Sequence, residues 1–135
     1  MIDDMYNLGS MEAYSGIMSF PEHQVRERVN ATGLPADRLR IVPGYLEPRS
    51  LAPDEVAFAC LDFDLYEPIL TGLRLLHPST RAGSILMVDD SRFFSSGPEL
   101  AVQHFLAEQE RAYELLEPPT GAGALYALRR MDNHA

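Results

Sequence analysis

Apolar and polar residues alternate along this chain with the periods of helices and strands, and their order predicts an α/β fold. Residues 1–18 show little periodicity, and we expect them to be irregular. Residues 19–22, with the sequence SFPE, are typical of a helix start, because serine and glutamate at this spacing bind free backbone N–H groups. The apolar spacing that follows, and Gly33 as a typical stop, predict a helix over 20–32.

Five short segments carry the patterns of β-strands. Residues 56–61, VAFACL, are continuously apolar, which is typical of a strand buried on both faces of a parallel sheet. Residues 84–88 have the same character, whereas residues 38–42 alternate between polar and apolar side chains. The last two segments flank a turn-forming stretch over 118–123 and predict a hairpin. Strands are therefore expected at 38–42, 56–61, 84–88, 113–117 and 124–129.

Two longer segments between these strands, 67–77 and 97–110, have the apolar spacing of helices. The predicted order of elements is thus α-β-β-α-β-α-β-β. Buried strands that alternate with helices indicate an α/β sheet, mostly parallel, with an antiparallel pair at its C-terminal end. With 135 residues, the chain has room for one domain.

Composition and charge disfavour several classes of function. The chain has 20 acidic and 11 basic residues, a net charge of −9, which disfavours binding to the phosphates of nucleic acids. All the basic residues are arginine, so chemistry that needs a lysine is excluded. The single cysteine, Cys60, excludes an internal disulfide and a cysteine-rich zinc site. No apolar run is long enough to span a bilayer and the N-terminus has no secretory signal, so we expect no membrane association and a cytoplasmic location.

Two acidic clusters follow the two most apolar strands and are the candidate functional residues. Asp62 and Asp64 come directly after the first of these strands, and Asp89 and Asp90 after the second. The carboxyl ends of parallel strands meet at one edge of a sheet, where α/β folds bind their ligands. Four carboxylates at this edge would repel each other unless a cation joined them or some of them stayed protonated. Oxygen ligands favour Mg²⁺ first, and Mn²⁺ or Ca²⁺ next. The alternative is that these aspartates only form turns and helix caps.

The acidic clusters and their surroundings resemble the macrocin O-methyltransferase (TylF-like) family. The resemblance rests on LDFDLYEP at 61–68 and RAGSILMVDD at 81–90, with further similarity in GYLE at 44–47. It implies that residues 1–135 form a single, partial class I methyltransferase-like domain. The implied fold is a truncated Rossmann-like methyltransferase sheet, mostly parallel with an antiparallel C-terminal hairpin, that lacks the first two strands.

The resemblance also implies an enzyme and a site. It implies that Asp62, Asp89 and Asp90 hold Mg²⁺ and that Asp64 is the general base. It implies S-adenosylmethionine as the methyl donor and a sugar hydroxyl of a natural product, in antibiotic biosynthesis, as the acceptor. This chemistry suits the residues, because a metal lowers the pKa of a bound hydroxyl and a carboxylate can take its proton.

The chain departs from the family in the part that binds the methyl donor. A glycine-rich turn after a first strand is missing, and the G-x-G at 121–123 lies in the predicted hairpin turn. Missing strands would expose strand edges, so we expect a homo-oligomer or a partner that supplies strands, unless 38–42 pairs directly with 56–61. The alternatives to an active enzyme are a non-catalytic relative that acts as an interaction subunit, and a metal-dependent enzyme without methyl transfer.

Overall fold

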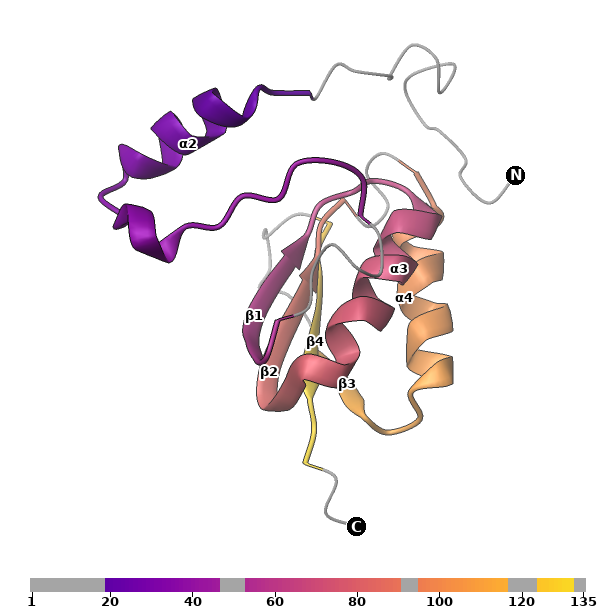
Figure 1. Cartoon of the computed structure of the whole chain (residues 1–135). Coiled ribbons are helices and arrows are strands. Elements are labelled where there is room, and N and C mark those ends of the chain that lie inside the picture. The colour runs from indigo at the N-terminus through magenta and orange to yellow at the C-terminus, as the bar shows by residue number, and fades with distance from the viewer. Residues whose placement is uncertain (1–18, 47–52, 91–94, 117–123, 133–135) are drawn as a thin grey trace. The chain divides into compact units, whose positions relative to one another are not determined.

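A four-stranded sheet with two helices on one face forms the larger of two units in the chain (Figure 1). The structure is a computed structural model, and it describes residues 19–46, 53–90, 95–116 and 124–132. The described residues up to Tyr45 belong to one unit, and those from Leu46 onward belong to the other.

The smaller unit contains the helix α2, Glu22–Asn30, and the short 3₁₀ helix η1, Ala36–Arg38. The predicted helix over 20–32 is confirmed, although Pro21 occupies the N-cap position without a side-chain hydrogen bond. The predicted strand at 38–42 is wrong, because η1 takes up its first residue and the rest joins no sheet. Alternation over five residues marks an extended segment, but a strand also needs a neighbour to bind its backbone groups.

The larger unit holds the sheet, whose strands lie in the order β1-β2-β4-β3. Only β1 and β2 are parallel to each other, and the other two pairs are antiparallel. The predicted C-terminal hairpin is therefore confirmed as an antiparallel pair, while the turn at 118–123 lies outside the described residues. The described sheet is mixed and not mostly parallel, because the 38–42 segment is not part of it. The strands are β1 (Val56–Leu61), β2 (Thr80–Val88), β3 (Tyr113–Leu116) and β4 (Tyr126–Arg130).

The two helices of this unit, α3 (Tyr66–Leu76) and α4 (Gly97–Glu108), pack against each other and against one face of the sheet (Figure 1). Both were predicted within two residues at each end. A short 3₁₀ helix, η2 (His77–Ser79), joins α3 to β2. The core between helices and sheet contains side chains that are fully buried, among them Ile69, Leu73, Leu86, Val88, Phe105 and Leu128. No helix in the described part of the chain is long and apolar enough to cross a membrane.

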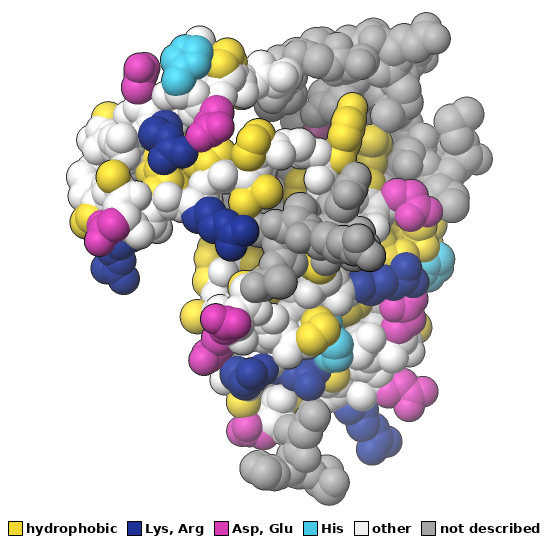
Figure 2. All heavy atoms as spheres, in the orientation of Figure 1, with side chains coloured by type: hydrophobic (Ala, Val, Ile, Leu, Met, Phe, Trp, Pro, Cys, Tyr) yellow, Lys and Arg dark blue, Asp and Glu magenta, His cyan; other side chains and the backbone are white. Residues whose placement is uncertain are grey.

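On the face of the sheet away from α3 and α4, side chains of β1 are exposed to solvent. Phe58 is 59% exposed and Cys60 is also exposed. The prediction that 56–61 is buried on both faces is therefore wrong, because α3 and α4 both pack on the same face of the sheet. Charged side chains of both signs are scattered over the face of the molecule shown in Figure 2.

An irregularity at the start of β2 aligns the ends of the two parallel strands. The register changes from Val56 opposite Thr80 to Phe58 opposite Ile85, so the extra residues lie on β2. The Ser84 hydroxyl stabilises this region, since it donates to the Val56 carbonyl at 2.6 Å and accepts the backbone N–H of Arg81 at 2.8 Å. From there the pairing is regular up to the carboxyl ends of both strands.

The stability of this unit should depend strongly on Phe105. Its ring is fully buried and lies 5.2 Å from the ring of Tyr113 between centroids. We expect Phe105→Ala to lower the free energy of unfolding by about 3–5 kcal/mol, measured by urea denaturation. The control is Leu115→Ala, which truncates a 45% exposed side chain on β3. Equal losses of unfolding free energy in the two variants would contradict the placement of Phe105 in the core.

Candidate functional site

The candidate site lies where β1 and β2 end together. Leu61 is paired with Val88, and the backbone N–H of Asp89 donates to the Leu61 carbonyl at 3.0 Å. The next residues of both strands therefore leave the sheet side by side. Asp64 and Asp90 then adopt left-handed backbone conformations, with φ of 59° and 53°. Aspartate tolerates this conformation better than most residues, and it lets the chain turn sharply toward the next element.

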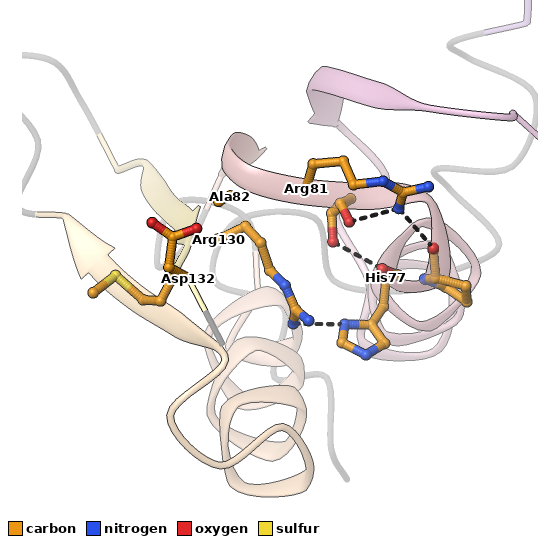
Figure 3. A pocket seen from close by; sticks show the side chains of 8 residues that line it. His77, Arg81, Ala82, Arg130 and Asp132 are labelled. Carbon is orange, nitrogen blue, oxygen red and sulfur yellow. Dashed lines mark hydrogen bonds between the residues drawn. The ribbon is translucent and has the colours of Figure 1, made fainter. Parts of the chain in front are cut away.

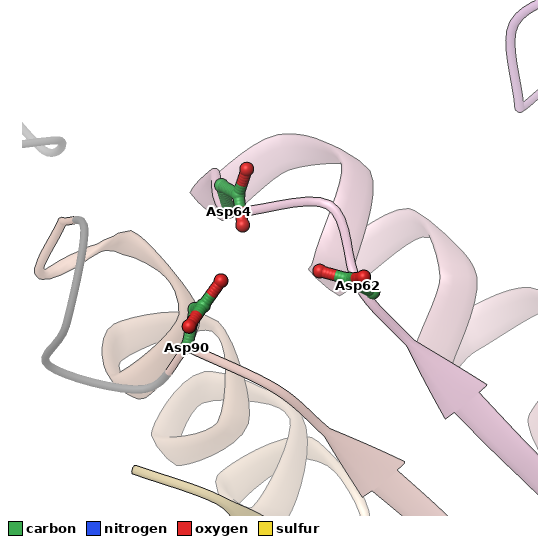
Figure 4. Close-up of side chains that lie close together, drawn as sticks. All are labelled: Asp62, Asp64 and Asp90. Carbon is green, nitrogen blue, oxygen red and sulfur yellow. The ribbon is translucent and has the colours of Figure 1, made fainter. Parts of the chain in front are cut away.

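Three of the four predicted aspartates come together at this edge (Figure 4). One carboxylate oxygen from each of Asp62, Asp64 and Asp90 lies within 4.8 Å of the other two. We call these residues the carboxylate trio. Asp62 is exposed, whereas the other two are half-buried. Such an arrangement can hold a divalent cation through oxygen ligands alone.

The fourth aspartate, Asp89, has a different setting. Its Oδ1 accepts the backbone N–H of Asp90 at 2.8 Å, and its carboxylate is not one of the trio. The predicted base, Asp64, instead shares the trio with two of the predicted metal ligands. The assignment of Asp62, Asp89 and Asp90 as ligands and of Asp64 as the base stays a prediction.

Burial and nearby carboxylates disfavour the ionised forms of two members of the trio, Asp62 and Asp90. Burial raises the pKa of Asp62 above its usual value, and the charges of Asp64 and Asp89 raise it further. The pKa of Asp90 is raised to about 6, first by burial and then by its hydrogen bond with Asp64 and the neighbouring carboxylates. A bound cation would remove this repulsion, so the electrostatics favour a positively charged ligand.

Ser95 fixes the backbone of the trio from the start of α4. Its side chain is fully buried, and its hydroxyl donates to the Asp64 carbonyl at 2.7 Å. The same hydroxyl accepts the backbone N–H of Gly97 at 3.1 Å. The sequence offered a signal for the local contact with Gly97 alone, because a serine two residues before a helix start is a common local cap.

Tyr66 connects the two helices next to the trio. It is the first residue of α3, and its hydroxyl lies 2.6 Å from Nδ1 of His104 on α4. The two rings meet edge to face, with centroids 5.5 Å apart. Ser95 thus holds the backbone of the Asp64 turn, and Tyr66 links α3 to α4 next to that turn.

A pocket of about 340 Å³ lies at the start of β2, away from the carboxylate trio (Figure 3). Arg130 points toward His77 there, with Nη1 3.5 Å from the ring Nδ1, and its guanidinium lies over the Tyr113 ring. Burial, followed by the positive charge of Arg130, lowers the pKa of His77. The Tyr113 hydroxyl lies 2.9 Å from the Thr80 hydroxyl. These polar groups bind one another, and we interpret them as support for the end of the sheet.

Comparisons with known proteins agree with the α/β fold. A family model described as Macrocin-O-methyltransferase (TylF) matches residues 3–117. The structure is similar to that of the O-methyltransferase NovP, with a TM-score of 0.75 and 22% identity, over 97% of this chain and 57% of that chain. At this identity, the similarity concerns the fold.

Two further relatives match a shorter part of the chain. The 8-demethyl-8-(2,3-dimethoxy-alpha-L-rhamnosyl)-tetracenomycin-C 4'-O-methyltransferase of Streptomyces olivaceus is 29% identical over 82 residues, which are 59% of this chain and 31% of that protein. CalS11, described as a TDP-rhamnose 3'-O-methyltransferase in calicheamicin biosynthesis, is 30% identical over 58% of this chain and 32% of that chain, with a TM-score of 0.48. The chain therefore spans about a third of the curated relative that it matches.

Removing one charge from the trio should stabilise the folded protein when no metal is present. We expect Asp90→Asn to raise the free energy of unfolding at pH 7 in EDTA by about 1 kcal/mol, because the folded state disfavours the ionised carboxyl. The pKa of this carboxyl is raised from 3.8 to about 6, so the gain should vanish as the pH falls through that window. Urea denaturation at several pH values measures the difference.

The matched control for this experiment is Asp54→Asn, which neutralises an exposed aspartate just before β1. It should leave the free energy of unfolding nearly unchanged at every pH. A loss of stability in the Asp90 variant at pH 7 would contradict the repulsion that we infer within the trio.

Proposed function

We propose that this chain, which belongs to the macrocin O-methyltransferase family, provides the Mg²⁺-binding part of an S-adenosylmethionine-dependent O-methyltransferase. The observation that carries the proposal is the carboxylate trio at the carboxyl ends of β1 and β2. The substrate class that we propose is a natural product with a sugar hydroxyl as the methyl acceptor. The name of the Streptomyces olivaceus relative, a methyltransferase of a rhamnosyl-bearing tetracenomycin, supports this class.

The donor set of the trio fits Mg²⁺. Oxygen ligands around one Mg²⁺ lie roughly 3–4 Å apart, given its short and regular ligand distances. The trio oxygens lie within 4.8 Å of one another, so a small shift of the side chains would bring them into range. All three groups are carboxylate oxygens, which suit a hard cation and not a soft one. In this proposal Asp62 and Asp90 bind the cation, and Asp64 takes the proton of the acceptor.

The residues of this chain would bind the acceptor and accept its proton. A bound Mg²⁺ would supply charge that lowers the pKa of the acceptor hydroxyl. Asp62 and Asp90 come from two different strand ends, so together they would fix the position of the hydroxyl oxygen at the edge of the sheet. Asp64 would take the hydroxyl proton as the oxygen attacks the methyl group, and the Ser95 hydrogen bond holds its backbone in place for that step.

The groups that hold S-adenosylmethionine are proposed to lie outside this chain. The chain spans 57% of NovP and lacks the glycine-rich turn that the family resemblance leads one to expect. In this proposal, methyl transfer requires the remaining part of the fold on the same or another polypeptide. A second candidate function is a non-catalytic interaction subunit. It is favoured by the outer edge of β1, which pairs with no strand among the described residues, because an unpaired strand edge can pair with another chain.

Metal titration tests the proposal. We expect Mg²⁺ to bind the wild-type chain in isothermal titration calorimetry with one site per chain. Asp62→Asn and Asp90→Asn should each weaken the affinity by at least about tenfold, since each removes a ligand charge. The control Asp54→Asn changes an acid outside the trio and should retain the wild-type affinity.

Asp64→Asn separates the role of base from that of ligand. If Asp64 is the base, this variant keeps its Mg²⁺ affinity, and it loses methyl transfer when the chain is complemented by the rest of the fold. If it also loses the metal, Asp64 is a ligand and the division of roles is wrong. Wild-type affinity in all three trio variants would refute the metal site.

A further inference from the structure

The pocket at the start of β2 is formed by elements on the side of the sheet away from the outer edge of β1 (Figure 3). Its lining comes from η2, from the first residues of β2 and from the end of β4. In the strand order, β4 lies beside β2 on the side opposite to β1. The described walls of this pocket therefore belong to this chain and do not depend on what lies beside β1.

Two arginines line this pocket from neighbouring strands. Arg81 is exposed near the start of β2, and Arg130 is half-buried at the end of β4. Neither of them forms an ion pair with a carboxylate among the described residues, whereas the adjacent Arg129 pairs with Glu114. In a chain with a net charge of −9, two guanidinium groups without an acidic partner concentrate positive charge at this pocket.

Both guanidinium groups are held in place and still have N–H groups to donate. Nη1 of Arg81 donates to the carbonyls of Thr80 and Pro78, at 3.0 and 3.4 Å. The guanidinium of Arg130 lies over the Tyr113 ring, 5.2 Å from its centroid. An arginine has five N–H donors, so both side chains keep donors beyond these contacts. Side chains that are already fixed lose less entropy when they bind a ligand.

His77 adds a group whose charge responds to an anion in the pocket. Its Nδ1 lies 3.5 Å from Nη1 of Arg130. Burial, followed by the charge of Arg130, lowers the pKa of His77, so the free imidazole is mainly uncharged at neutral pH. An anion beside Arg130 would offset that charge and favour the protonated imidazole. His77 would then carry a third positive charge at the pocket.

We propose that this pocket binds a phosphate group between Arg81 and Arg130. A tetrahedral phosphate presents oxygens in several directions, so it can accept from guanidinium groups on two strands, whereas a planar carboxylate is matched by one guanidinium. The volume of about 340 Å³ lies in the range of small-molecule pockets and leaves room for the organic part of a phosphate monoester. This site is separate from the carboxylate trio and from the proposed methyl transfer.

One acidic side chain, Asp132, also lines the pocket and opposes an anion there. It is exposed, and its carboxylate forms no ion pair with either arginine in the described part of the chain. The two arginines therefore outweigh it, and removal of its charge should tighten phosphate binding. Because salt screens exposed charges, the affinity for phosphate should fall as the salt concentration rises.

An NMR titration with inorganic phosphate and with phenyl phosphate, in EDTA and at constant ionic strength, tests the proposal. We expect both probes to shift the amide signals of residues 77–82 and 130–132 with one site per chain. Arg81→Gln and Arg130→Gln should each raise the dissociation constant at least about tenfold, since each removes a charged donor. The matched control Arg129→Gln removes the same charge one residue away and should keep the wild-type affinity. Asp132→Asn should lower the dissociation constant.

The imidazole signals of His77 give a second readout. Phosphate should raise the pKa of His77 in the wild type and leave it unchanged in Arg130→Gln. Circular dichroism confirms that each variant is folded, and Arg81→Gln changes an exposed side chain. A wild type that binds neither probe would overturn the proposal. Equal losses of affinity in Arg129→Gln and Arg130→Gln would also overturn it, because they would indicate general attraction to positive charge. Neither magnesium nor methyl donor is present, so each of these results is independent of the proposed enzymatic function.

Discussion

The parallel pairing of β1 with β2 determines where every candidate functional side chain lies. Leu61 stands opposite Val88, and the hydrogen bond from the Asp89 backbone to the Leu61 carbonyl continues the ladder by one residue. Both strands therefore end at the same level, and the acids that follow them leave the sheet together. A shift of one residue would turn the buried side chains outward, so the core beneath the site protects the register.

The same arrangement carries an electrostatic cost that the surrounding structure offsets. Burial, the hydrogen bond with Asp64 and repulsion by neighbouring carboxylates raise the pKa of Asp90 to about 6, so the site favours a bound cation. The Asp64 turn is held by the buried Ser95 of α4, and the first residue of α3 contacts His104 on the same helix. The packing of α3 on α4 thus supports the backbone of the Asp64 turn. Stability given up at a charged site is common where function needs that charge.

The sequence predicted the elements whose patterns are long or strongly apolar. Strand 56–61 and both helices of the larger unit were found because burial of one face leaves a clear period. The prediction of a strand at 38–42 was wrong because five alternating residues cannot show whether another strand lies beside them. The prediction that 56–61 is buried on both faces was wrong for a related reason. An apolar strand does not reveal on which face of the sheet the helices pack.

The candidate site was predictable in its residues and less so in its geometry. Four aspartates after two strands indicated where carboxylates would meet. The sequence could not show that Asp64 and Asp90 have positive φ angles, which set the direction of their side chains. It therefore did not reveal that Asp64 lies with Asp62 and Asp90, while Asp89 binds a backbone N–H. Ser95 was missed because its role depends on contact with a residue far away in the chain.

The central claim is that the carboxylate trio is a cation site, and paramagnetic Mn²⁺ tests it most directly. In two-dimensional NMR spectra, Mn²⁺ broadens the signals of nuclei close to it, and it accepts the same oxygen ligands as Mg²⁺. At substoichiometric Mn²⁺, we expect the amide signals of residues 62–66 and 89–90 to disappear first, and an excess of Mg²⁺ to restore them. Signals of residues 77–81, at the other end of β2, should persist. Equal broadening of signals near acidic residues all over the chain, or no broadening at all, would contradict a cation site at the carboxylate trio.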